Sequence, residues 1–167
     1  SQKFGNKEAL IFENHTFSFN EINDLVEKLA SGLASLGIKE KEVVTLYASN
    51  SWEWIISYFS IARIGAVINP VNTMLTPEEI KYVVKDCNAK TIITSSDKAS
   101  EIMDLKKGGI VNSIVSFDNP PKESIDFNEL IKEKYKQLKM PKLNPDSLST
   151  IGYTSGTTGY PKGAMQS

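Results

Sequence analysis

The sequence predicts an α/β protein with a doubly wound, mostly parallel sheet and flanking helices. Short apolar runs alternate with amphipathic segments of about 10–15 residues along most of the chain, which is the pattern of βαβ units. Several apolar runs are nearly continuous, as expected for strands that are buried on both faces. With 167 residues, 40% hydrophobic and 23% charged, the chain is long enough to bury a sizeable globular core.

The first two apolar segments, residues 9–12 and 16–18, predict a small β-hairpin. His15, the one histidine of the chain, lies at its turn. A metal-binding or catalytic histidine needs convergent partners, and the neighbouring sequence offers none. We therefore expect His15 to have a structural role.

A strong amphipathic helix follows the hairpin. Ser18 is a good N-cap, Glu21 completes a capping box, and Gly37 is a natural stop after the last turn. Its apolar residues recur at helical spacing and predict a core-facing stripe: Ile22, Leu25, Val26, Leu29, Leu33 and Leu36.

Two strands and a helix are expected next. Residues 43–48 form a nearly continuous apolar run that suits a buried parallel strand. Asn50 and Glu53 are candidate caps of a helix that runs to Gly65. Residues 66–70 predict another strand, which the proline at its end terminates.

The segment from Thr76 carries a clear helix start, with Pro77 at the first helical position and Glu79 in the capping box. Its expected inner face consists of Ile80, Val83, Val84 and Cys87. Cys87, the one cysteine, cannot form an internal disulfide and is expected to act as a small buried hydrophobe.

The pattern continues to residue 136. Residues 91–94 and 113–117 predict strands, and a weaker helix is expected over 97–107 before a Gly-Gly break. Asp126 and Glu129 are candidate caps of a last helix that ends near Lys136.

Charge and hydropathy exclude several classes of protein. Nineteen basic residues face twenty acidic ones, and Arg63 is the one arginine, so no nucleic-acid partner is expected. No run of about 18 apolar residues predicts a transmembrane span, and the first six residues lack an apolar signal core. We expect a soluble, cytoplasmic protein.

The residues that indicate chemistry are concentrated at 151–163, Ile-Gly-Tyr-Thr-Ser-Gly-Thr-Thr-Gly-Tyr-Pro-Lys-Gly. Glycines let the backbone approach a ligand closely, and successive amides, hydroxyls and the ammonium of Lys162 suit a polyphosphate. A Walker A loop is excluded because Pro161 precedes the lysine and Gly163 follows it. On composition alone, an ordinary surface loop is the alternative.

The string Tyr-Thr-Ser-Gly-Thr-Thr-Gly-Tyr-Pro-Lys-Gly resembles the phosphate-loop signature of the adenylate-forming, or AMP-binding, superfamily. This superfamily includes acyl-CoA synthetases, aryl-CoA ligases, firefly-type luciferases and peptide-synthetase adenylation domains. Residues 16–22, 48–54, 65–72 and 75–80 resemble other blocks of the same family. The resemblance thus covers nearly all 167 residues, at one end of a much longer protein.

The resemblance implies an acid–thiol ligase that works in two steps. A carboxylate attacks the α-phosphate of ATP to give an acyl-adenylate and pyrophosphate, and the thiol of CoA then displaces AMP. The loop would hold the β- and γ-phosphates with Mg²⁺ nearby, which stabilises the charge passing to pyrophosphate. The residues implied for this role are Thr154, Ser155, Gly156, Thr157, Thr158, Gly159 and Lys162.

The family's remaining motifs lie beyond the signature. Residues 1–167 are therefore expected to be an incomplete N-terminal portion of the large domain, with the phosphate loop at 153–163 and without the C-terminal domain. The resemblance places the catalytic lysine in that C-terminal domain, so Lys162 is a phosphate-loop lysine. We predict no catalytic residue and no metal ligand within this chain, and no turnover from the chain alone.

The substrate class is narrowed by two blocks, 69–72 and 75–79, which look like those of fatty acyl- and aryl-CoA ligases. We expect a medium- or long-chain fatty acid, with an aryl-CoA ligase as the alternative. A stand-alone nucleotide-binding module and a non-catalytic scaffold also stay open. An incomplete domain should expose sheet or apolar surface, so we expect the chain to associate into dimers or oligomers.

Overall fold

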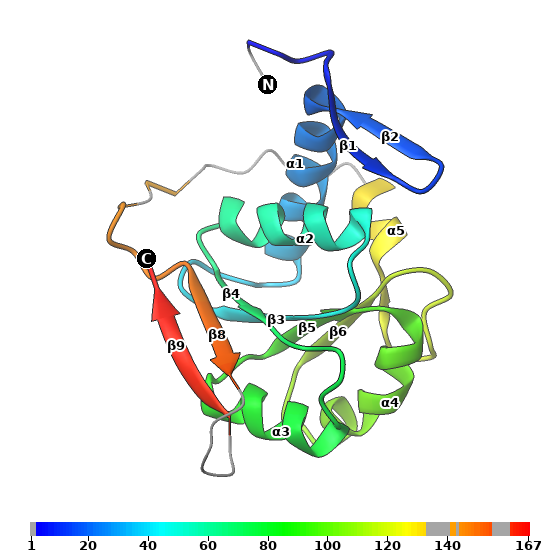
Figure 1. Cartoon of the computed structure of the whole chain (residues 1–167). Helices are drawn as coiled ribbons and strands as arrows, with labels where there is room; N and C mark the ends of the chain where they lie inside the picture. The colour runs from blue at the N-terminus through cyan, green and yellow to red at the C-terminus, as the bar shows by residue number, and fades with distance from the viewer. Residues whose placement is uncertain (1–2, 133–140, 143, 155–160) are drawn as a thin grey trace.

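The computed structural model describes residues 3–132, 141–142, 144–154 and 161–167. Within these ranges the chain forms a small antiparallel hairpin and one seven-stranded sheet covered by helices on both faces (Figure 1). The strand order of the sheet is β7-β6-β5-β3-β4-β8-β9, and every neighbouring pair is parallel except β8 and β9. The predicted doubly wound, mostly parallel α/β fold is confirmed.

The N-terminal hairpin pairs β1 (Glu8–Phe12) with β2 (His15–Ser18) and leads directly into helix α1 (Phe19–Ser35). Both halves of the predicted capping box are present, with Ser18 Oγ accepting from the Glu21 amide. The helix ends before Gly37, whose φ of 91° a side chain would disfavour.

The centre of the sheet contains strands that are buried along most of their length. They are β3 (Val43–Tyr47), β4 (Val67–Pro70), β5 (Thr91–Thr94) and β6 (Ser113–Ser116). Alternate residues of one strand face opposite layers: Leu46 belongs to the core under α1, and Tyr47 to the core under α3. Both cores therefore depend on β3.

Helices α1, α2 (Trp52–Arg63) and α5 (Phe127–Lys132) cover one face of the sheet. Helices α3 (Pro77–Asp86) and α4 (Ser96–Lys107) cover the other. Thr76 caps α3 with the predicted Glu79 box.

The predicted cap of α2 was wrong. Neither Asn50 nor Glu53 caps the helix: Ser51 does, because its hydroxyl accepts from the Trp54 amide at 3.2 Å. An N-cap oxygen must reach the amide two or three residues on, and the observed start at Trp52 gives that geometry to Ser51. Glu53 lies in the first turn of α2, where its negative charge interacts favourably with the positive end of the helix dipole.

Two strands were not predicted. Strand β7 (Ile125–Asp126) has two residues, and β9 (Lys162–Gln166) is exposed throughout and shows no alternation of apolar and polar residues. Strand β9 pairs antiparallel with β8 (Thr150–Thr154) at the edge of the sheet. Strand β8 leads directly into the glycine-rich motif. Residues 133–136 of the last predicted helix lie outside the described ranges.

Apolar side chains remain exposed on the α1–α2 face. Phe19 is 41% exposed and Phe59 is 51% exposed, and they line a groove of about 610 Å³ between β1, α1 and α2. The expected apolar surface is therefore present, while self-association through it stays a prediction. No helix in the described ranges is long and apolar enough to cross a membrane.

Candidate functional site

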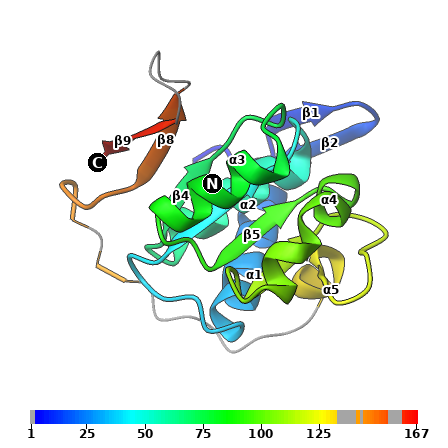
Figure 2. The same ribbon diagram turned by 90° about the horizontal axis from the view of Figure 1, so that it is seen from below.

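Strands β8 and β9, which flank the central residues of the glycine- and hydroxyl-rich motif, pair at one edge of the sheet (Figure 2). The structure places two of its seven predicted site residues: Thr154 ends β8 and Lys162 begins β9, directly opposite each other in the ladder. The other five, Ser155, Gly156, Thr157, Thr158 and Gly159, lie outside the described residues. The hairpin thus brings the predicted lysine and the first predicted hydroxyl to the same end of two paired strands.

Thr154 and Lys162 are both exposed at this end of the hairpin. Strand β8 runs parallel to β4, so Thr154 lies at the carboxyl edge of the sheet. In open α/β sheets, ligands bind outside the carboxyl ends of the strands. The position and the donor types therefore agree with binding of an anion at this edge.

Tyr153 attaches the C-terminal end of strand β8 to helix α3. Its hydroxyl donates to Asp86 Oδ2 at 2.5 Å, across 67 residues of sequence. Burial raises the pKa of the Tyr153 phenol, and the hydrogen bond to Asp86 raises it further. The phenol therefore stays protonated and keeps its donor at physiological pH.

Gly163 gives the Tyr153 ring its space. The two residues face each other across the β8–β9 ladder. A Cβ at position 163 would lie 3.1 Å from Cζ of Tyr153 and 3.2 Å from Cγ2 of Ile151, which is tighter than ordinary contact. The glycine that follows Lys162 thus has a packing reason, which the sequence alone did not reveal.

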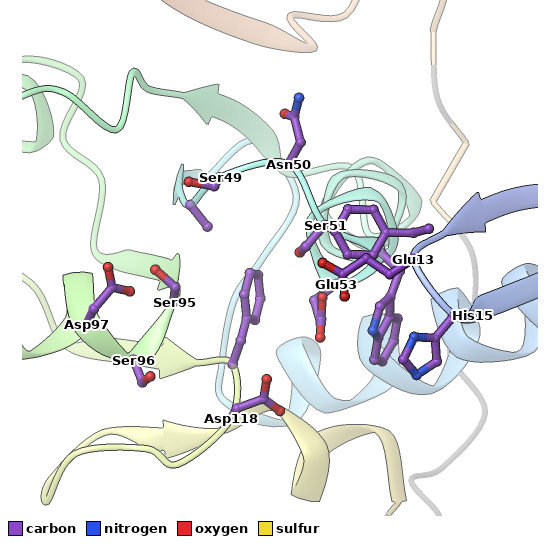
Figure 3. A pocket seen from close by; sticks show the side chains of 14 residues that line it. Glu13, His15, Ser49, Asn50, Ser51, Glu53, Ser95, Ser96, Asp97 and Asp118 are labelled. Atoms are coloured by element: carbon purple, nitrogen blue, oxygen red, sulfur yellow. The ribbon is translucent and has the colours of Figure 1, made fainter.

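A second candidate site, missed by the sequence analysis, is a cavity of about 410 Å³ at the carboxyl ends of β3 and β5 (Figure 3). These strands are neighbours, yet β3 leads to α2 on one face and β5 leads to α4 on the other. Such a switch point opens a crevice between the two loops. The only signal in the sequence was polar residues after each strand, at 49–51 and 95–97, and it could not give the strand order.

The chemistry of this crevice differs from that of the β8–β9 hairpin. Its lining combines serine hydroxyls with the aromatic rings of Trp52 and Phe117 and the carboxylates of Glu13, Glu53, Asp97 and Asp118. A hydrogen bond from the Ser95 side chain lowers the pKa of Asp97, which stays ionised. Carboxylates repel phosphate. The crevice therefore suits a polar or cationic group better than a polyphosphate.

His15 lies exposed at the rim of the same crevice (Figure 3), and its expected structural role stays a prediction. Its ring stacks on Phe17 with 6.1 Å between centroids and is tilted against Trp52 at 6.3 Å. Among the described residues, no three His, Cys, Asp or Glu side chains form a group that could hold a metal ion.

Cys87 is partly buried at the end of α3, less deeply than the expected core position. Burial raises the pKa of its thiol, so the thiol is kept protonated and is a weak nucleophile. This agrees with the expected structural role.

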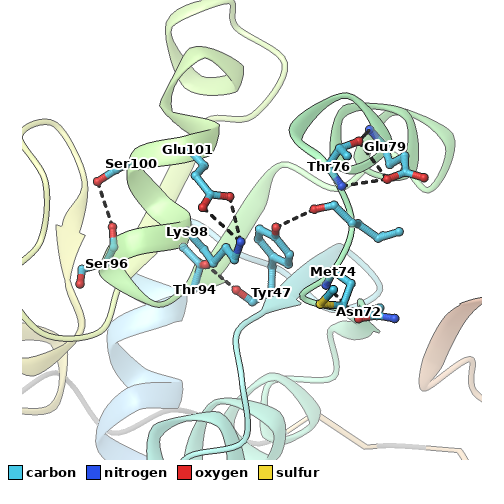
Figure 4. Close-up of polar contacts among 11 residues, drawn as sticks. Tyr47, Asn72, Met74, Thr76, Glu79, Thr94, Ser96, Lys98, Ser100 and Glu101 are labelled. Atoms are coloured by element: carbon cyan, nitrogen blue, oxygen red, sulfur yellow. Dashed lines mark hydrogen bonds and ion pairs between the residues drawn. The ribbon is translucent and has the colours of Figure 1, made fainter.

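A third polar cluster surrounds Tyr47 on the α3–α4 face (Figure 4). Its hydroxyl donates to the Leu75 carbonyl at 2.9 Å, while the Lys98 ammonium lies 5.7 Å from its ring centroid and pairs with Glu101. Thr94 also donates to the Tyr47 carbonyl. These contacts connect β3, β5, α4 and the turn before α3, and each of these polar groups has a partner within the cluster.

Comparison with known proteins decides the family. The model of the family described as AMP-binding enzyme matches residues 1–167. The chain belongs to this family. The match includes strands β8 and β9 and the segment between them.

The curated relatives of this AMP-binding chain include CoA ligases. 4-Coumarate:CoA ligase 1 of Petunia hybrida is 30% identical over 165 residues, covering 98% of this chain and 30% of the relative. Indoleacetate–CoA ligase of Aromatoleum aromaticum is 31% identical over 162 residues, covering 96% and 32%. The chain therefore spans about a third of the length of the relatives it matches.

Solved structures agree with the fold. The anthranilate CoA ligase AuaEII, in complex with anthranoyl-AMP, superimposes with a TM-score of 0.90 at 28% identity, over 98% of this chain and 32% of that one. The O-succinylbenzoate CoA synthetase of Bacillus subtilis, in complex with AMP, gives a TM-score of 0.81 at 25% identity, over 99% and 40%.

Proposed function

We propose that this chain is the ATP-phosphate-binding part of an AMP-forming acid–CoA ligase. The observation that carries the proposal is the AMP-binding family match over residues 1–167, which includes the hairpin motif. The complete protein would join a carboxylic acid to ATP with release of pyrophosphate. It would then transfer the acyl group from the adenylate to CoA with release of AMP.

The contribution of this chain would be electrostatic. When the acid attacks the α-phosphate, negative charge passes to the leaving pyrophosphate. Donors that are already oriented toward the β- and γ-phosphates stabilise that charge without reorganising. In this proposal Lys162 supplies a point charge, Thr154 supplies a hydroxyl, and Ser155, Gly156, Thr157, Thr158 and Gly159 supply hydroxyls and backbone amides.

Magnesium fits this scheme as part of the nucleotide substrate. The motif at 153–163 contains hydroxyl, amide and ammonium groups and no carboxylate. These groups suit phosphate oxygens, whereas Mg²⁺ in nucleotide sites is held by one or two carboxylates together with the substrate phosphates. We therefore assign the hairpin to the phosphates and no metal ligand to it.

The acid is proposed to be aromatic. Relatives at 30–31% identity include ligases named for 4-coumarate and indoleacetate, and a solved relative at 28% holds anthranoyl-AMP. A long-chain fatty-acid CoA ligase is a structural neighbour at 22% identity. This identity supports a shared fold and gives no information on the substrate. These relatives favour the aryl alternative over the fatty acid expected from the sequence blocks.

The test is acid-dependent exchange of labelled pyrophosphate into ATP, followed by thioester formation with CoA. It should use the complete reading frame that contains this chain, with cinnamates, benzoates, indoleacetate and fatty acids as the panel. We expect exchange with an aromatic acid and AMP as the product. Exchange with fatty acids alone would reject the substrate class, and no exchange with any acid would reject the activity.

The length of the reading frame distinguishes the proposed ligase from the alternative, a stand-alone nucleotide-binding module. We expect the frame to continue past codon 167 for about twice this length again, given that the chain covers 30% of its relatives. A stop codon there would instead make phosphate binding by the chain alone the property to measure.

A further inference from the structure

A proline interrupts the hydrogen-bond ladder that β4 offers to β8. The amide of Val67 donates toward β3, to the carbonyl of Glu42 directly before that strand, and the amide of Val71, directly after β4, donates to the carbonyl of Leu46 in β3. The amide of Ile68 donates to the other side, at the carbonyl of Ser149, the residue directly before β8. Backbone donors alternate along a strand, so the donor at position 70 should face β8.

Position 70 is Pro70, which has no N–H. Two residues along β8 from Ser149, the next carbonyl that would receive this donor belongs to Ile151. Proline is rare inside a sheet because it leaves such an acceptor unpaired. Strand β4 nevertheless has neighbours on both sides, β3 and β8.

The side chain of Asn69 fills the gap. Its Nδ2 donates to the Ile151 carbonyl at 2.8 Å, and the residue is fully buried. Its Oδ1 accepts from the Thr45 hydroxyl at 3.0 Å and from the Cys87 thiol at 3.7 Å. The Ile151 carbonyl can only accept, while the Thr45 hydroxyl can donate, so these partners fix the orientation of the amide.

This contact lies where the pairing of β8 with β4 is short, although β8 pairs with β9 along its length. Within the described residues, β4 and β8 share one paired position, Ile68 opposite Thr150. Beyond it toward the motif, the Asn69 contact holds residue 151 and the Asp86 contact holds Tyr153. Hydrogen bonds from β4 and α3 therefore hold three alternate residues of this segment: Ser149, Ile151 and Tyr153.

We propose that Asn69 is a positioning residue for ATP: its amide replaces the missing Pro70 donor and holds β8 in register, so that Thr154 and Lys162 face the phosphates. The inference rests on the proposed function. It assigns a role to a residue that would not touch the nucleotide. Loss of the contact should weaken ATP binding more than acid binding.

The test compares Asn69→Leu with the double variant Asn69→Leu/Pro70→Ala in the complete protein. Leucine has a similar volume and no donor, so the Ile151 carbonyl becomes unpaired. Alanine at position 70 restores a backbone N–H directed at β8. We expect about a tenfold rise in the KM for ATP in the single variant, as one unpaired buried acceptor implies. The double variant should return to within about threefold of wild type.

A matched control separates positioning from lost stability. Ser60→Ala removes a buried hydroxyl that bonds the Val26 and Ile56 carbonyls on the α1–α2 face. It should lower the melting temperature without changing the KM for ATP. The KM for the acid should stay within about twofold of wild type in all four variants, and Pro70→Ala alone should bind ATP like wild type.

The outcomes distinguish the two proposals. An unchanged KM for ATP in Asn69→Leu, with an active wild type, would overturn the role of Asn69 and leave the ligase activity standing. That role would also be overturned if Ser60→Ala raised the KM equally, or if Pro70→Ala failed to rescue a folded double variant. A wild type inactive with every acid would reject the proposed function, and the positioning role for ATP with it.

Discussion

The centre and the edge of this sheet are held together in different ways. At the centre, β5 and β6 share four paired positions, and their side chains are almost entirely buried. At the edge, β4 and β8 share one paired position, and β9 is exposed throughout. Two of the residues predicted to bind phosphate, Thr154 at the end of β8 and Lys162 at the start of β9, lie on this weakly attached side of the sheet.

This difference indicates how stability and function are separated along the chain. The central strands gain their stability from burial between two helical layers. Strand β8, which pairs with the edge strand β9 along its length, is attached to β4 at one paired position and otherwise by the side chains of Asn69 and Asp86. Changes at the centre should therefore alter stability, and changes at the edge should alter ligand binding.

The largest effect is expected in the core. Leu46 is fully buried in β3, and Leu46→Ala should lower the free energy of unfolding by about 2–5 kcal/mol. Met165 on β9 is 75% exposed, so Met165→Ala should change the free energy of unfolding by less than about 0.5 kcal/mol. Urea unfolding followed by tryptophan fluorescence measures both. Equal losses would contradict the contrast between centre and edge.

Removing the positive charge of Lys162, at the start of β9, should have the next largest effect. Lys162→Met keeps the apolar stem and removes the ammonium, so the KM for ATP should rise by about 10- to 100-fold, as one charged hydrogen bond implies. Pyrophosphate exchange measures this. Lys107→Met, on α4, is the control and should not change the KM. A normal KM in Lys162→Met would remove the lysine from the site.

The Tyr153–Asp86 bond should give a smaller, pH-dependent effect. Tyr153→Phe should cost about 1.5 kcal/mol near neutral pH, the lower end for a charged hydrogen bond, because the pair is partly exposed. The folded-state pKa of Tyr153 is raised above the unfolded value near 10, so this stability is present below about pH 10 and lost as pH rises.

Chemical denaturation of wild type and Tyr153→Phe between about pH 7 and 11 measures this difference. The two proteins should converge as the pH rises. Asp86→Asn, whose amide oxygen still accepts without a charge, should fall between them at neutral pH. A gap that widened with pH would contradict the assigned bond.

The smallest expected effect concerns helix capping, which should not distinguish centre from edge. Thr76→Ala removes the α3 cap and should cost about 1 kcal/mol. Ser95 precedes α4 and makes no side-chain cap bond, so Ser95→Ala should cost less than half of that. Thermal unfolding compares the two, and equal losses would count against the cap at Thr76.

Local features of the fold could be predicted from the sequence. The capping boxes of Ser18 and Thr76 were predicted correctly because each depends on residues three apart. The cap of α2 was wrong because Asn50, Ser51 and Glu53 are all possible caps, and only the backbone geometry chooses Ser51.

The contacts that hold the site could not be predicted. Asn69 and Ile151 are 82 residues apart, and Asp86 and Tyr153 are 67 apart. Both contacts depend on the strand order, which places β8 beside β4 and which hydrophobic periodicity does not encode. The crevice between β3 and β5 was missed for the same reason. The assignment of Thr154 and Lys162 to phosphate binding stays a prediction.

Amide hydrogen exchange of the complete protein, with and without MgATP, would show where on the sheet the nucleotide binds. If the hairpin binds the phosphates, MgATP should slow exchange in β8 and β9, around Thr154 and Lys162, and leave the loops at 49–51 and 95–97 unchanged. Protection of those two loops, with no change in β8 and β9, would place the nucleotide in the crevice at the centre of the sheet and contradict phosphate binding at the edge.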